Sequence, residues 1–266
     1  MTYTALKVEH RGAVEILSLN RPEALNALSP EMAREITDYF EALKQRLDVR
    51  VVILRGEGRL FCAGADLGTD AFAGQGSGRA QRQMAMQKVY SGVVRAMRTC
   101  PQPIIALIHG AACGGGFSLA LASDVRYATP DARMNAAYIR VGLGGCDMGA
   151  GYFLPRLIGV SNASEFLLSG RFIGAERALR IGLISEIVPA EKLVETGLAL
   201  AEDMLKTAPM GLRMTKESLN AEIDAPSLDA ALTVEDRQQV ILIDTDDHRE
   251  AVKAFREKRA AVYRDA

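Results

Sequence analysis

Two short loops of small residues, each placed between an apolar run and a helix, constrain most strongly what this chain of 266 residues folds into. The apolar runs are residues 51–54 and 104–108, and the loops are residues 61–66 (FCAGAD) and 109–116 (HGAACGGG). Short apolar runs rich in Val and Ile predict buried strands. Strands that alternate with helices predict a sheet buried between helices. The sequence therefore predicts an α/β fold with two successive strand–loop–helix units.

The composition of these two loops also suggests a chemical role. Glycine and alanine let a ligand approach the backbone closely and leave N–H groups available as donors. Two converging N–H groups form an oxyanion hole, which stabilises an enolate or a tetrahedral oxyanion. Alternatively, small residues only ease the packing of strand against helix. One loop alone does not separate the two interpretations, whereas the pair favours the oxyanion hole.

The rest of the chain is expected to begin with strands at 6–9 and 14–19 and to be helical from about residue 193. A helix should start at Ser29-Pro30, because serine caps helices and proline suits the first helical position. The glycines between Gly68 and Gly78 predict either a mobile lid or a plain connection. A soft boundary near Pro209 divides a core, residues 1–208, from a C-terminal helical region, residues 209–266, which is expected to mediate oligomerisation.

Composition and charge exclude several classes of function. A net charge of −1 gives no electrostatic basis for binding nucleic acid or an anionic membrane surface. No apolar run approaches the roughly 20 residues of a membrane span. The first residues lack the basic-then-apolar pattern of a signal peptide, so a cytoplasmic location is expected.

Cysteines and histidines are scattered. The four cysteines form no CxxC pair, so neither a metal site nor a disulfide framework is expected. Cys62 and Cys113 lie within the two loops, where small apolar packing is their expected role. The three histidines are too dispersed for a metal site, and His109 is expected to be a hydrogen-bonded structural residue.

Other segments extend the pattern into a family resemblance. Residues 19–22 (LNRP) and 24–28 (ALNAL) precede the first loop, and the matching later segments are 154–159 (LPRLIG), 178–184 (ALRIGLI) and 254–259 (AFREKR). Together with the loops, they resemble the crotonase (enoyl-CoA hydratase/isomerase) superfamily over nearly the whole chain. The resemblance implies a ββα spiral core with a C-terminal helical region. It also implies an acyl-CoA thioester substrate, no cofactor beyond the substrate's own coenzyme A, and a trimer or dimer of trimers.

The resemblance assigns candidate binding residues by position. Ala65 and Gly115 match the residues whose backbone N–H groups hold the thioester oxygen. Ala63, Asp66 and Leu67 match the loop along which coenzyme A lies.

Two C-terminal residues, Phe255 and Lys258, match positions that reach the nucleotide end of coenzyme A, often on a neighbouring subunit. A lysine suits a phosphate as a point charge. A solvated cation on a helix is the alternative for Lys258.

The catalytic acids depart from the family pattern. The two glutamates of enoyl-CoA hydratases match Ser118 and Tyr138, so the two-carboxylate mechanism is in doubt. Ser118 is expected to pack or to form a hydrogen bond. Tyr138 stays a candidate catalytic residue by position, but a phenol with a pKa near 10 cannot act as a base at neutral pH.

One carboxylate remains as a candidate acid or base. Asp147 lies close in alignment to a catalytic aspartate of relatives that isomerise dienoyl-CoA or dehalogenate aryl-CoA esters. A carboxylate beside an acyl pocket suits proton shuttling. The alternative is a helix N-cap, which aspartate also favours.

These observations predict enoyl-CoA hydration or double-bond isomerisation in fatty-acid metabolism, with Asp147 as the main acid and base. The alternative is a non-catalytic acyl-CoA binder or carrier that retained the pocket and lost the acids. A Ser-His-Asp hydrolase built on Ser118 is poorly supported, because the segment around it lacks the second glycine of a nucleophile elbow.

Overall fold

The structure, a computed structural model, describes residues 3–68 and 76–266. Its main sheet has six strands in the order β1-β2-β3-β4-β6-β9, in which β1 and β2 are antiparallel and the remaining pairs are parallel. The strands are β1 (Leu6–Arg11), β2 (Val14–Leu19), β3 (Val51–Gly56), β4 (Ile104–Ile108), β6 (Val125–Ala128) and β9 (Glu186–Ile187). A second sheet contains β5 (Ala111–Cys113), β7 (Arg133–Asn135) and β8 (Ile173–Gly174).

Ten α-helices and three short 3-10 helices surround these sheets in the described chain. The α-helices are α1 (Pro30–Leu43), α2 (Arg79–Thr99), α3 (Gly115–Ala122), α4 (Ala150–Ile158), α5 (Val160–Ser169), α6 (Ala175–Arg180), α7 (Leu193–Leu205), α8 (Pro209–Glu222), α9 (Leu228–Ile243) and α10 (Asp246–Glu257). The 3-10 helices are η1 (Pro22–Ala24), η2 (Ala137–Val141) and η3 (Ala190–Lys192). No helix in the described ranges is both long and apolar enough to cross a membrane.

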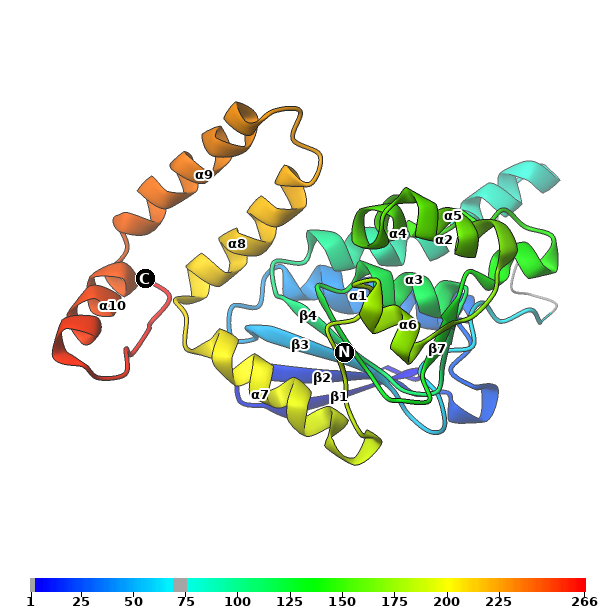
Figure 1. The fold of residues 1–266 in the computed structure, drawn as a ribbon, viewed down its shortest axis with the longest axis horizontal. Helices are drawn as coiled ribbons and strands as arrows, with labels where there is room; N and C mark the ends of the chain where they lie inside the picture. Colours follow the sequence, from blue (N-terminus) through cyan, green and yellow to red (C-terminus); the bar gives the residue numbers. More distant parts are fainter. Residues whose placement is uncertain (1–2, 69–75) are drawn as a thin grey trace.

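The main sheet is buried on both faces, as its continuous apolar strands predict. Helices α1, α2 and α3 lie on one side of the sheet and α7 lies on the other (Figure 1). Successive residues of a strand point to opposite faces: Val52 and Leu54 of β3 pack in the larger hydrophobic cluster with α1 and α2, whereas Val51 and Ile53 pack in a second cluster with α7. This arrangement fixes the ends of β3 and β4, from which the two small-residue loops depart.

Most of the predicted element positions hold. Ser29 caps α1, and its side chain accepts a hydrogen bond from the backbone N–H of Met32 at 3.1 Å. Helix α8 begins at Pro209, within the segment from about residue 193 that is predicted to be helical. The segment 68–78, for which a lid and a plain connection are both open, falls largely on residues 69–75, which lie outside the described residues.

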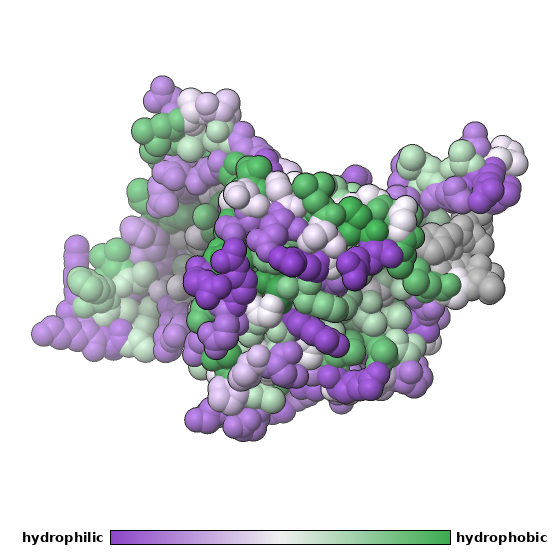
Figure 2. Space-filling view, turned by 45° about the vertical axis from the view of Figure 1, so that its right-hand side comes forward, coloured by the Kyte–Doolittle hydropathy of each residue, from purple (hydrophilic) through white to green (hydrophobic). Residues whose placement is uncertain are grey.

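The last three helices project from the body of the molecule (Figure 1). Figure 2 shows apolar side chains among hydrophilic ones on this projecting region. In the described chain α9 contributes no buried residue, although it carries large apolar side chains that are exposed: Leu228, Leu232, Val240, Ile241 and Ile243.

Candidate active site

The two small-residue loops lie against each other, as their shared position after parallel strands predicts. The Cys62 N–H donates to the carbonyl of Ala111 at 3.0 Å, and the Cys113 N–H donates back to the carbonyl of Cys62 at 2.9 Å. Loops 61–66 and 109–116 are thus joined by backbone hydrogen bonds as they leave the sheet. Their backbones approach one another as an oxyanion hole requires.

Each loop turns at a glycine just before its candidate donor. Gly64 has φ +105° and Gly114 has φ +47°, a region that favours glycine, and they precede Ala65 and Gly115. Gly115 is also the first residue of α3, so its N–H belongs to the unpaired donors of a helix start. A Cβ placed on Gly115 would lie 2.6 Å from Cδ1 of Leu28 and 3.8 Å from the Ala65 nitrogen. Glycine at 115 therefore avoids a clash and keeps the two N–H groups close together.

A cavity of about 90 Å³ opens beside these two N–H groups. Both loops, α2, η2 and the segment before α4 line it, through Ala63, Gly64, Ala65, Leu67, Gln87, Tyr90, Gly114, Gly115, Ala137, Tyr138, Val141, Leu143, Asp147 and Met148. Of the predicted site residues, the structure brings Ala63, Ala65, Leu67, Gly115, Tyr138 and Asp147 together here. Among the described residues Asp147 is the one acidic side chain in this lining.

The Asp147 carboxylate is held by two hydrogen bonds to one oxygen. Its Oδ1 accepts from Nε2 of Gln87 at 2.5 Å and from the backbone N–H of Met148 at 2.7 Å. Helix α4 starts at Ala150 with Gly149 as its N-cap residue. The helix-cap interpretation of Asp147 is therefore wrong, because the loop turns at Met148 and Gly149 and leaves the carboxylate two residues before the cap.

Gln87 is a residue that the sequence reasoning missed. It lies on α2, 60 residues before Asp147, and lines the same cavity. Nothing local to α2 signals this contact, since the buried face of the helix consists of residues such as Met86 and Tyr90. Only the fold brings the amide to the carboxylate.

Ser118 and Tyr138 are buried and bonded to each other. Their hydroxyl oxygens lie 2.5 Å apart, and the Tyr138 hydroxyl donates to the carbonyl of Gly114 at 2.9 Å. Burial foremost, and the negative charge of Asp147, raise the pKa of Tyr138 well above its ordinary value. Tyr138 is therefore a neutral hydrogen-bond donor at physiological pH and not a base. The expected hydrogen bond of Ser118 is confirmed.

The Asp66 carboxylate takes part in an ion pair. Both terminal nitrogens of Arg21 lie 3.1 Å from its Oδ2, and its Oδ1 accepts from the backbone N–H of Gly68 at 3.1 Å. Its side chain therefore fixes the first loop against the segment before η1. Its neighbour Leu67 is 62% exposed at the rim of the cavity.

Phe255 and Lys258 are not brought to the cavity within one chain. They lie at the end of α10, on the projecting C-terminal region (Figure 1). Phe255 is 85% exposed. Lys258 ends the helix in a left-handed conformation, with φ +54°.

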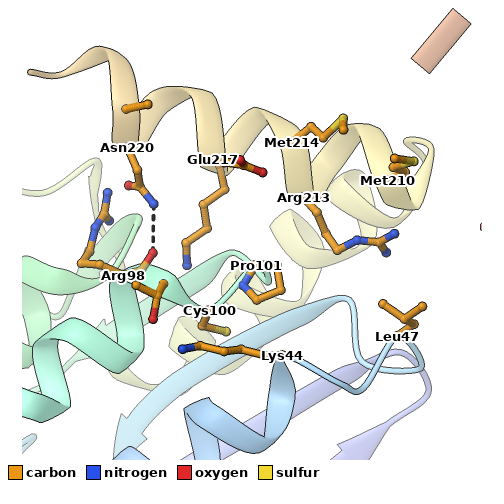
Figure 3. Close-up of a pocket in the computed structure, with 13 residues that line it drawn as sticks. Lys44, Leu47, Arg98, Cys100, Pro101, Met210, Arg213, Met214, Glu217 and Asn220 are labelled. Atoms are coloured by element: carbon orange, nitrogen blue, oxygen red, sulfur yellow. Dashed lines mark hydrogen bonds between the residues drawn. The ribbon is translucent and has the colours of Figure 1, made fainter. Parts of the chain in front are cut away.

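A larger cavity, of about 650 Å³, lies beneath α8 and away from the two loops (Figure 3). The ammonium group of Lys216 donates to the carbonyl of Gln102 at 2.7 Å and pairs with Asp124 at 2.9 Å. The Asn220 amide donates to the carbonyl of Arg98 at 3.0 Å, the contact drawn in Figure 3. These bonds attach α8 to the body of the molecule.

Two further charged side chains of this second cavity form ion pairs. Arg213 pairs with Asp265 at 2.7 Å and Lys44 pairs with Glu41 at 2.7 Å. Burial raises the pKa of the Cys100 thiol to about 11, so it is a poor nucleophile at neutral pH. We assign structural attachment, not chemistry, to this cavity. In the described part of the chain, no group of three His, Cys, Asp or Glu side chains is arranged to hold a metal ion.

Comparison with known proteins agrees with the fold. Residues 9–266 match the protein family described as enoyl-CoA hydratase/isomerase. A protein of Mycobacterium leprae named as a probable enoyl-CoA hydratase is 38% identical over 259 residues, covering 96% of this chain and 88% of that protein. The (E)-benzylidenesuccinyl-CoA hydratase of Thauera aromatica is 34% identical over 263 residues. The aligned region covers 95% of this chain and 96% of that protein.

Solved structures give the same result. The crystal structure of an enoyl-CoA hydratase from Bacillus anthracis superposes with a TM-score of 0.92 at 32% identity, covering 99% of this chain and 100% of that one. The chain therefore belongs to the enoyl-CoA hydratase/isomerase family, and the predicted crotonase fold is confirmed. It is an acyl-CoA-processing enzyme of the hydratase/isomerase type.

Proposed function

We propose that this enzyme moves a carbon–carbon double bond in an enoyl-CoA thioester, with Asp147 as its acid and base. The observation that carries this proposal is the charge content of the cavity: among the described residues Asp147 is its one acidic side chain. Ser118 and Tyr138 stand where hydratases of the family have glutamates, and their hydroxyls are bonded to each other. One carboxylate suffices for a proton shift, whereas the family's hydration mechanism uses two.

In the proposed reaction, the thioester oxygen accepts hydrogen bonds from the N–H groups of Ala65 and Gly115. The Asp147 carboxylate removes a proton from the α-carbon of a 3-enoyl group, and the electron pair moves into an enolate that the two N–H groups stabilise. The carboxylic acid then returns the proton to the γ-carbon, and a 2-enoyl product forms. Atoms and charge balance, and the enzyme returns to its starting state.

Two donors on Oδ1 of Asp147 support this role. Because Gln87 and Met148 both donate to Oδ1, the second oxygen is left to exchange a proton with the substrate. The cavity is small, so it suits the reacting end of the acyl group, while coenzyme A would run over Ala63 and Leu67 at the rim.

The nucleotide end of coenzyme A would be held by a neighbouring subunit. We propose a trimer or a dimer of trimers in the cytoplasm, in which Phe255 and Lys258 of one chain reach the ligand of the next. The exposed apolar side chains of α9 support an assembly that buries them.

Product analysis tests the reaction type. The purified protein is given crotonyl-CoA, a 3-enoyl-CoA and a 3,5-dienoyl-CoA in turn, and the products are separated by chromatography. A shifted double bond is the expected outcome with the 3-enoyl or dienoyl substrate. Absence of turnover with all three at high enzyme concentration would contradict the proposal, and tight calorimetric binding without turnover would then favour the acyl-CoA binder.

Hydration is the second candidate reaction. It is favoured by the relative from Thauera aromatica, which is an (E)-benzylidenesuccinyl-CoA hydratase. A 3-hydroxyacyl-CoA formed from crotonyl-CoA in the same experiment would select hydration over isomerisation.

A further inference from the structure

The hydrogen bond from Tyr138 ends on a particular peptide group. The carbonyl of Gly114 and the N–H of Gly115 belong to one planar peptide unit. The Tyr138 hydroxyl donates to that carbonyl at 2.9 Å, on the opposite side of the peptide from the candidate oxyanion donor. A hydrogen bond to a carbonyl polarises the whole amide and strengthens its N–H as a donor.

The direction of each hydrogen bond in this cluster follows from which atoms have a proton to donate. A tyrosine hydroxyl has one proton. The contact to Gly114 joins a hydroxyl to a carbonyl, so the proton on Tyr138 must lie between them. Ser118 then supplies the proton in its 2.5 Å contact with Tyr138, because the alternative acceptor for Ser118, the carbonyl of Asp147, lies at 3.3 Å.

We infer that Ser118 and Tyr138 form a relay of hydrogen bonds that orients and polarises the Gly114–Gly115 peptide and so strengthens the oxyanion hole. The inference rests on the proposed function through its assignment of Gly115 as an oxyanion donor. Tyr138 is a positioning residue in this scheme, since it acts on the substrate through the peptide. The relay occupies the two positions that the family resemblance matches to the hydratase glutamates, and it gives them a different role.

Burial and the first loop support the relay. Ser118 is 0% exposed and Tyr138 is 6% exposed, so water does not compete for these hydrogen bonds. The raised pKa of Tyr138 keeps its proton in place. The first loop has a counterpart, because the carbonyl of Gly64, in the same peptide as the Ala65 N–H, accepts from the Leu28 N–H at 2.7 Å. Both donor peptides are therefore held from their carbonyl side.

The test measures how strongly the oxyanion hole polarises a bound thioester. Butyryl-CoA labelled with ¹³C at the carbonyl has no double bond to move, so it reports binding without turnover. Difference infrared spectroscopy should show its carbonyl band at lower frequency on the wild-type protein than in buffer. In Tyr138→Phe this shift should shrink by roughly 10–30%, the contribution of one cooperative hydrogen bond. The kcat with a 3-enoyl-CoA should fall about 2- to 10-fold, a fraction of the value of a whole oxyanion donor, at unchanged KM.

Two further variants separate the relay from a loss of packing. Tyr39→Phe removes another buried hydroxyl, which donates to Glu15 at 2.7 Å away from the cavity, and should leave the carbonyl band unchanged. Ser118→Ala removes the first donor of the relay. It should also reduce the frequency shift of the carbonyl band, but by less than Tyr138→Phe does. It also keeps the test decisive if Tyr138→Phe does not fold.

The outcomes distinguish the relay from the proposed function. A wild-type protein that binds butyryl-CoA without shifting its carbonyl band contradicts the oxyanion-hole assignment, and the relay falls with it. A wild-type shift that stays complete in folded Tyr138→Phe or Ser118→Ala overturns the relay alone.

Discussion

The two oxygens of the Asp147 carboxylate have different surroundings, which suits the proton transfer proposed for it. Oδ1 accepts from the Gln87 amide and from the Met148 backbone, and this orients the group toward the cavity. The sequence points to Asp147 through its resemblance to catalytic aspartates. It gives no signal for Gln87, because the partner lies on a helix 60 residues earlier.

Gln87→Leu should therefore reduce kcat by about 10- to 100-fold with little change in KM, since a hydrogen bond to a charged group contributes about 1.5–3 kcal/mol. Steady-state kinetics with a 3-enoyl-CoA measure the effect. Gln83→Leu, an exposed glutamine one turn earlier on α2, serves as the matched control. In an Asp147→Asn background the Gln87 substitution should cause no further loss. An equal loss in both backgrounds would show that Gln87 does not act through Asp147.

Buried thiols should make stability fall at high pH. Burial raises the pKa of the Cys62 thiol from its ordinary value to about 12, so the folded state favours the neutral thiol. This contribution is complete below pH 9 and is lost as the pH rises toward 12. The urea midpoint of Cys62→Ala should accordingly fall less between pH 8 and pH 10.5 than that of the wild type. Cys146→Ala, at an exposed thiol, is the control. Identical pH slopes for wild type and Cys62→Ala would refute this explanation.

At the scale of elements, strand and loop patterns carry most of the information. The apolar runs predict β3 and β4, and the glycines predict the close approach of the two loops, because both signals are local. The contact between Gln87 of α2 and Asp147, in the segment before α4, depends on tertiary packing that no local pattern encodes. Helix α4 illustrates the limit: the sequence allows Asp147 as its cap, but the left-handed turn at Met148 and Gly149 moves the helix start to Ala150.

The first loop offers a direct test of backbone chemistry. Ala65→Pro removes one candidate oxyanion N–H, so turnover should fall by about 10²–10³, the usual value of one such donor. Proline also restrains φ, so the circular dichroism spectrum must show a folded variant. Wild-type turnover in a folded Ala65→Pro protein would remove Ala65 from the oxyanion hole.

At the scale of the whole molecule, α9 is the element least explained by one chain. Its exposed apolar side chains project with the C-terminal region, and α8 is attached to the body through the buried Lys216. The sequence predicts that this region is helical. It does not predict their direction, which is set by contacts such as Lys216 with Asp124.

Light scattering at micromolar concentration should give the mass of a trimer or a hexamer. Ile241→Asp places a charge on the exposed face of α9 and should lower that mass, because a buried unpaired charge is costly. The matched control is Glu235→Asp, a change on the same helix that keeps the charge. A monomer mass for the wild type would contradict the proposed assembly, and with it the role of Lys258 at a neighbouring ligand.

The turnover of Asp147→Asn with a 3-enoyl-CoA tests most directly whether Asp147 is the acid and base of this enzyme. Asparagine keeps the size of the side chain but cannot accept and return a proton. Turnover should therefore fall by about 10²–10⁴, while calorimetric affinity for the acyl-CoA stays close to that of the wild type. Full activity in Asp147→Asn would contradict this role, because the cavity would then work without its proposed acid and base.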